Sequence, residues 1–192
     1  MKKLMIVAAV AVAALASNAA SFNWSNTGGA TNGVIYDYQA NSTKLYSATV
    51  AYTAYLICAG DTTQADLLTA IRKGDALSDY GIAGASATLN SSSKISATDT
   101  FSYGTTGNDY TFYFAILDSA NDQILISDTA VAKAQESGTS AIGFSGSKTW
   151  SNQAFGEDAF SSAGWYSTVP EPTSGLLLLL GMAGLALRRK QK

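Results

Sequence analysis

Two pairs of acidic side chains in this 192-residue chain could support acid–base chemistry. Hydrolysis of a glycosidic bond requires two carboxyl groups at a suitable separation. Two pairs close in sequence are Asp118 with Asp122 and Glu157 with Asp158. Aspartate is also favoured in turns, because its side chain hydrogen-bonds to the neighbouring backbone. Both pairs lie among small or polar residues typical of turns, so we favour this structural interpretation and expect no enzymatic activity.

The first of these segments also offers oxygen atoms that calcium could bind, from Asp118, Asn121 and Asp122. Calcium-binding loops place their acidic ligands at alternate positions followed by a glycine. The segment lacks that spacing, and the sequence therefore predicts neither a metal site nor a bound cofactor.

Histidine is absent and cysteine occurs once, at position 58. The lack of histidine excludes serine–histidine and cysteine–histidine catalysis, together with zinc sites built on histidine. A single cysteine cannot form a disulfide within the chain. Cys58 lies in the apolar stretch YLICAG, which favours a small buried side chain. An intermolecular link or a reactive thiol remains the alternative.

The tryptophans are a third source of chemistry, because an exposed aromatic ring can stack on a sugar ring. Most aromatic side chains of a sandwich belong to its core, but Trp150 and Trp165 lie in surroundings rich in serine, glycine and asparagine, which makes them the best candidates for exposure and possible glycan contacts. Burial in a core is the alternative for any aromatic side chain.

The charge of the chain is unevenly distributed. Residues 20–169 contain six positive and thirteen negative side chains and carry a net charge of −7, whereas the whole chain carries −2. Nucleic-acid binding depends on basic side chains that neutralise phosphates. The acidic central part therefore predicts no nucleic-acid partner, and its charge favours solubility outside the cell.

The N-terminus has the three parts of a secretory signal peptide. Lys2 and Lys3 precede an apolar run over residues 4–15, and Ser17 and Ala19 are small residues at positions −3 and −1 of a cleavage site. The run is shorter than the roughly 20 residues that a membrane span needs, which argues against an uncleaved anchor. We expect signal peptidase to cut after Ala19.

The C-terminus, residues 168–192, is called the tag below and also has three parts. Both prolines of the chain flank a glutamate in Pro170-Glu171-Pro172, an apolar run covers residues 175–187, and Arg188, Arg189 and Lys190 follow. A 13-residue helix is roughly 20 Å long, against a hydrocarbon core of about 30 Å. The run predicts a short or transient transmembrane segment, with the basic end retained on the cytoplasmic side.

The prolines hold their neighbours in extended conformations. An extended segment suits recognition in a groove of a processing enzyme, while a simple helix stop is the alternative. The proline–glutamate–proline triplet, the run GLLLLLGMAGLAL and the basic RRK closely resemble the PEP-CTERM sorting signal of exported bacterial proteins.

The resemblance implies handling by an exosortase, an integral-membrane enzyme thought to cut near the motif. Pro170, Glu171 and Pro172 would form the sorting motif, and Arg188, Arg189 and Lys190 the charges that stop transfer. The chain would be anchored in the inner membrane until it is processed and would then reach the cell surface or extracellular matrix. The resemblance also implies an association with extracellular polysaccharide and biofilm matrix.

Between the two ends, residues 20–167 are expected to form one domain, called the body below. Short stretches rich in aromatic or β-branched residues alternate with clusters of glycine, serine, asparagine and aspartate. They predict strands at residues 33–39, 48–59, 85–89, 99–103, 109–117, 123–132 and 141–145. Strands in this number indicate a mainly β fold, an antiparallel sandwich of jelly-roll type.

One hairpin and one helix are predicted in more detail. The strand at 109–117 is apolar on both faces, which places it in the middle of the packed structure, and residues 118–122 form its turn. Thr63 can cap a helix whose apolar stripe is Leu67, Leu68 and Ile71 and which ends at Gly74. We expect this helix to cover one end of the sandwich.

The sequence thus predicts an exported surface or matrix protein without catalysis of its own. A carbohydrate-binding module that engages extracellular polysaccharide is the alternative.

Overall fold

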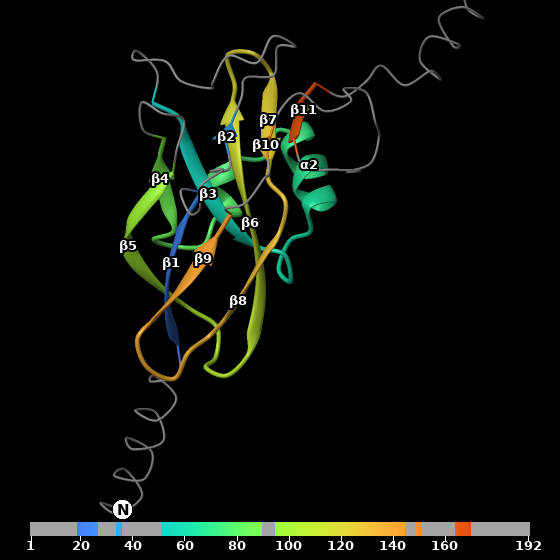
Figure 1. The fold of residues 1–192 in the computed structure, drawn as a ribbon. Coiled ribbons are helices and arrows are strands. Elements are labelled where there is room, and N and C mark those ends of the chain that lie inside the picture. Colours follow the sequence, from blue (N-terminus) through green and yellow to red (C-terminus); the bar gives the residue numbers. More distant parts are fainter. Residues whose placement is uncertain are drawn as a thin grey trace, which may run out of the picture.

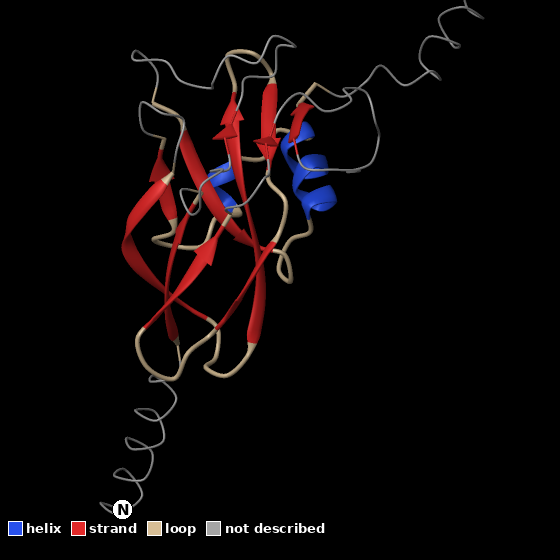
Figure 2. Cartoon of the chain, in the orientation of Figure 1, coloured by secondary structure: helices blue, strands red, loops and turns tan. Residues whose placement is uncertain are grey.

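The computed structural model describes residues 19–26, 34–35, 51–89, 95–144, 149–150 and 164–169, which consist mostly of β-strands (Figures 1 and 2). In chain order the elements are β1 (Ala20–Ser25), β2 (Val34–Ile35), β3 (Thr53–Cys58), α2 (Gln64–Arg72), the 3-10 helix η1 (Leu77–Asp79), β4 (Ser86–Thr88), β5 (Ser96–Tyr103), β6 (Asp109–Asp118), β7 (Gln123–Ile126), β8 (Ala130–Lys133), β9 (Thr139–Gly143), β10 (Thr149–Trp150) and β11 (Gly164–Ser167).

These strands form two main sheets. The larger has the order β11-β7-β6-β3-β4, with β8 also paired to β6, and the smaller has the order β5-β1-β9. The larger sheet is antiparallel throughout, whereas β1 and β9 run parallel in the smaller one. A third, two-stranded pair joins β10 and β2 in parallel. The predicted mainly β sandwich is confirmed, with parallel pairs that the sequence did not indicate.

Strand β6 is the centre of the fold, as its two apolar faces predicted. It pairs with β3 along one edge, and with β8 and then β7 along the other. Phe112, Phe114 and Ile116 point into the core between the sheets, while Tyr113 and Ala115 belong to a second core on the opposite face. A strand with apolar layers on both sides has to be apolar on both faces.

One buried serine explains why the predicted strand at 123–132 is two strands. The Phe114 backbone N–H donates to Ser127 Oγ at 2.9 Å, and the Ser127 hydroxyl donates to the Asp128 carbonyl at 2.8 Å. A side chain therefore takes a position that a carbonyl would hold in a regular ladder. The ladder along β6 is interrupted at this point. Strand β7 therefore ends at Ile126, and β8 begins only at Ala130.

Aromatic rings fill the core between the sheets. Trp24 from β1 lies with its ring centroid 5.8 Å from that of Phe114, and Phe114 lies 5.0 Å from Phe144 in an edge-to-face arrangement. Phe22 contacts Phe112 in the same manner at 5.5 Å. The N-terminal strand thus supplies two of the largest side chains of the core, at alternate positions that face inward.

Helix α2 forms a third layer on the outer face of the larger sheet (Figure 2). Leu67, Leu68 and Ile71 are buried against a sheet surface that includes Tyr113 and Tyr166. The expectation that this helix covers one end of the sandwich is wrong, because the outer face of β6 also carries apolar side chains that need a covering layer. The predicted cap is confirmed: the Asp66 backbone N–H donates to Thr63 Oγ1 at 3.1 Å.

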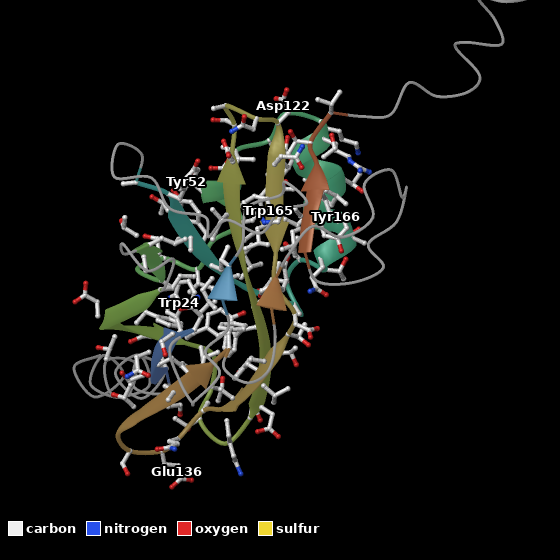
Figure 3. The ribbon with its side chains drawn as sticks, turned by 45° about the horizontal axis from the view of Figure 1, so that its top comes forward. Trp24, Tyr52, Asp122, Glu136, Trp165 and Tyr166 are labelled. Carbon is white, nitrogen blue, oxygen red and sulfur yellow. The ribbon has the colours of Figure 1, made fainter. Side chains whose placement is uncertain are left out.

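The two ends of the described body lie at opposite poles. β1 begins at the lower end of the view in Figure 1, whereas β11 lies at the upper end beside β7. Figure 3 labels Asp122 at the upper pole and Glu136 at the lower one. The tag therefore leaves the body at the pole remote from the first residue of β1.

Candidate functional site

The last described strand, β11, is an integral part of the larger sheet. It pairs antiparallel with β7, from Gly164 opposite Ile126 to Ser167 opposite Gln123. Trp165 and Tyr166 are 0% and 2% exposed and lie in the two different cores. Because both faces of this short strand are buried, residues 164–167 are part of the folded body.

Three hydrogen bonds fix the chain where it leaves the sheet. Arg72 Nε of α2 donates to the Ser167 carbonyl at 3.1 Å, and the Thr168 backbone N–H donates to the Asp122 carbonyl at 2.9 Å. The Val169 N–H then donates to Ser167 Oγ at 3.2 Å. Val169 is 52% exposed, so the chain reaches the surface one residue before Pro170.

Asp118 lies in the same region, at the start of the turn between β6 and β7. It is 3% exposed, and its Oδ2 accepts hydrogen bonds from Asn121 Nδ2 at 2.9 Å and from the Tyr52 hydroxyl at 3.3 Å. The Asn121 N–H also donates to the Asp118 carbonyl at 3.3 Å. The predicted turn is confirmed, and Asp122, with φ of +53°, adopts the left-handed conformation that aspartate tolerates better than most residues.

A pocket of about 630 Å³ opens beside Asp118. Tyr52 and Tyr55 from the start of β3, Leu77 from η1 and Asn121 from the hairpin turn also line it. The pocket could not be predicted from the sequence, because its walls come from three segments that are distant in the chain. Within the described ranges no group of three or more metal-ligating side chains is present.

Several tyrosine hydroxyls have shifted pKa values. Burial raises the pKa of Tyr113, whose hydroxyl donates to the Thr62 carbonyl at 2.9 Å. Burial, followed by the hydrogen bond to Asp61, raises the pKa of Tyr103. Tyr110 behaves in the opposite way: the Thr105 N–H donates to its oxygen at 2.7 Å and lowers its pKa. Each of these hydroxyls is hydrogen-bonded to another part of the body. We therefore attribute the shifted pKa values to the stability of the fold and not to a reactive centre.

Comparison with known protein families gives one match, to the description "PEP-CTERM protein-sorting motif", over residues 168–190. The chain ends in a PEP-CTERM sorting motif. Such a motif marks an exported protein that an exosortase sorts. No curated protein and no solved structure matches the chain.

The PEP-CTERM motif contains all the tag residues predicted to act in sorting. Residues 168–190 include the apolar segment 175–187, the triplet Pro170, Glu171 and Pro172, and the basic residues Arg188, Arg189 and Lys190. All of these residues lie outside the described part of the chain. In the part of the chain that is described, no helix has the length and apolar character of a membrane span. Only Thr168 and Val169 of the motif are described, and both are bonded to the body.

At the other end, Ala19 is exposed and Ala20 is the first residue of β1, 2% exposed. The predicted cleavage after Ala19 would therefore release a chain whose first residue already belongs to the body. The remainder of the predicted signal peptide lies outside the described residues.

Trp165, a candidate for exposure and glycan contact, is fully buried. Trp165 pairs with Leu125 in the ladder between β11 and β7 and points into the core between the sheets. Its small polar neighbours in the sequence gave no indication of this, since the pairing is with a segment 40 residues away. Trp150 lies in β10 opposite Ile35, but its side chain is outside the described part. Glu157 and Asp158 are outside it as well.

Cys58 is 5% exposed and free, which confirms the expectation of a buried side chain.

Proposed function

We propose that the body is a structural component of the cell surface or extracellular matrix, and that it has no catalytic activity of its own. The observation that carries this proposal is the position of β11. The strand completes the larger sheet before the PEP-CTERM motif begins. A cut within the tag therefore removes none of the described strands and none of the core side chains that the structure describes.

The order of the processing steps follows from the predicted signal peptide at the N-terminus and the tag at the C-terminus. Signal peptidase removes residues 1–19, and the apolar segment 175–187 holds the chain in the inner membrane with its basic end inside. The exosortase then acts near Pro170-Glu171-Pro172 and passes the body to the surface or matrix. The acidic charge of the body, −7 over residues 20–169, suits a protein that must stay soluble during this transfer.

The sorting step is tested with Glu171→Gln, which removes the charge between the two prolines. Cells that produce the wild-type chain or the variant are separated into membrane, surface and matrix fractions. We expect the wild-type body in the surface or matrix fraction and the variant in the membrane fraction. Glu136→Gln is the matched control, because Glu136 is an exposed glutamate at the opposite pole (Figure 3). Equal distribution of Glu171→Gln and wild type would contradict the proposal.

The absence of catalysis is tested on the same material. Incubation with polysaccharides followed by an assay for new reducing ends is expected to show no release of sugar ends. Release that disappears in Asp118→Asn would overturn the non-catalytic assignment. A carbohydrate-binding body is the second candidate, and the pocket beside Asp118 is the observation that favours it.

A further inference from the structure

The pocket beside Asp118 is built by the register of the larger sheet. Ala54 of β3 pairs with Ile116 of β6. Continuing this antiparallel register by two residues brings Tyr52 opposite Asp118, where the hydroxyl donates to Oδ2 at 3.3 Å. The 3-10 helix η1 closes a further side with Leu77. At about 630 Å³, the pocket falls within the range of about 300–1,000 Å³ typical of small-molecule sites.

Its polar groups are held in fixed positions. Asp118 is 3% exposed and accepts two hydrogen bonds, both at Oδ2. The carboxylate has a second oxygen, Oδ1, which is the atom that would accept a hydrogen bond from a ligand hydroxyl. Asn121 lies on the same turn and adds an amide group to the wall. Together they offer the mixture of donors and acceptors that a group of neighbouring hydroxyls requires.

Two aromatic side chains contribute to different sides of the wall, because Tyr52 packs against the core between the sheets and Tyr55 against the core under α2. Tyr52 and Tyr55 both line the pocket and are half-buried. The position of Tyr55 is fixed by Gly81: a Cβ atom at residue 81 would lie 2.9 Å from Tyr55 Cδ1. Aromatic rings present flat apolar surfaces together with a polar hydroxyl. Such surfaces suit the apolar faces of sugar rings, while Asp118 and Asn121 suit their hydroxyl groups.

The charge of the region decides which ligand is favoured. Among the described residues that line the pocket none is lysine or arginine, and Asp118 is the charged group. An anionic ligand would find no cation among these lining residues, and the net charge of −7 over residues 20–169 disfavours it further. A flat polyhydroxylated ligand without charge satisfies both the rings and the polar groups.

We infer that the pocket formed by Tyr52, Tyr55, Asp118 and Asn121 binds neutral sugar residues of a glycan. This inference deepens the second candidate of the proposed function, the carbohydrate-binding body, by naming its site and ligand class, and it rests on the proposed function for the extracellular setting in which a glycan would be met. Binding and sorting are measured separately, so failure of one does not entail failure of the other.

The test uses the exported protein as the producing cells release it. Isothermal titration calorimetry measures its binding to neutral oligosaccharides of glucose, mannose and xylose. Oligogalacturonate serves as the anionic probe and chitosan oligosaccharide as the cationic one. We expect binding to at least one neutral probe and none to oligogalacturonate.

Three variants examine the pocket itself. Tyr52→Ala removes an aromatic wall, Asn121→Ala removes the amide, and Gly81→Ala displaces the Tyr55 ring without removing any group that lines the pocket. Each is expected to weaken binding about tenfold or more, the effect of losing one well-placed hydrogen bond or contact surface. Tyr103→Phe is the matched control: it removes a tyrosine-to-carboxylate hydrogen bond, to Asp61, outside the pocket, and should leave binding unchanged.

Thermal unfolding of each variant shows that it is folded under the conditions of the titration. Should Tyr52→Ala or Asn121→Ala prove unfolded, Gly81→Ala and Tyr52→Phe carry the test. Binding of no neutral probe, binding of a charged probe alone, or binding that the pocket variants and Tyr103→Phe change equally would overturn the inference.

Discussion

At the scale of single residues, the buried tyrosine hydroxyls couple the stability of the body to alkaline pH. Tyr113 lies in the core under α2 and has a pKa raised above its ordinary value by burial. In the unfolded chain its pKa returns to about 10. Above that pH the unfolded state loses a proton that the folded state keeps, so the free energy of unfolding falls as pH rises. Below pH of about 10 the contribution is fully present.

We therefore expect urea unfolding to show a loss of stability between about pH 10 and pH 11.5, the range above the ordinary tyrosine pKa. Tyr113→Phe should flatten this loss, because the titrating hydroxyl is gone. Tyr110→Phe is the control, since the pKa of Tyr110 is lowered and its removal cannot flatten the loss. An alkaline slope in Tyr113→Phe equal to that of wild type would contradict the assignment.

At the scale of elements, β11 connects the body to the tag, and Trp165 attaches it to the core. A fully buried tryptophan replaced by alanine costs about 3–5 kcal/mol, a large share of the about 5–15 kcal/mol that stabilises an ordinary domain. Trp165→Ala should therefore lower the free energy of unfolding by this amount, measured in urea. Val131→Ala, at a position 66% exposed, should change it by less than about 0.5 kcal/mol. Equal effects of the two substitutions would show that Trp165 does not belong to the core.

The same elements show what could be predicted from the sequence. The central place of β6 followed from apolar residues at every position from 112 to 117, and the helix cap followed from Thr63 and Asp66 three residues apart. Both are local patterns. The strand character of residues 20–25 and 164–167 was missed, because one segment adjoins the signal peptide and the other is short and surrounded by small residues. Their pairing with β9 and β7 depends on contacts far apart in the chain.

The two candidate sites also differ in whether a local sequence pattern is enough to predict them. The PEP-CTERM motif is a linear pattern, so three consecutive elements of the sequence suffice to find it. The pocket is not linear: Tyr52 and Asp118 meet only because β3 and β6 pair in one particular register. For Trp165 the local composition made exposure conceivable, whereas its burial depends on the strand that lies beside it.

At the scale of the whole molecule, the first and last described strands place the predicted cleavage after Ala19 and the tag at opposite poles of the body. Ala20 opens β1 at one pole, and Val169 reaches the surface at the other, one residue before the motif prolines. The predicted cleavage after Ala19 precedes β1, and the proposed cut in the tag follows β11, so both are compatible with a folded body. This arrangement suits a cargo whose ends serve transport and whose middle is delivered intact.

The intact mass of the protein recovered outside the cells tests this account most directly. We expect a species that begins at Ala20 and ends after Val169 but before residue 175, with every strand present and the apolar segment gone. A recovered species that still carries residues 175–192, or one that is cut within β11, would contradict it.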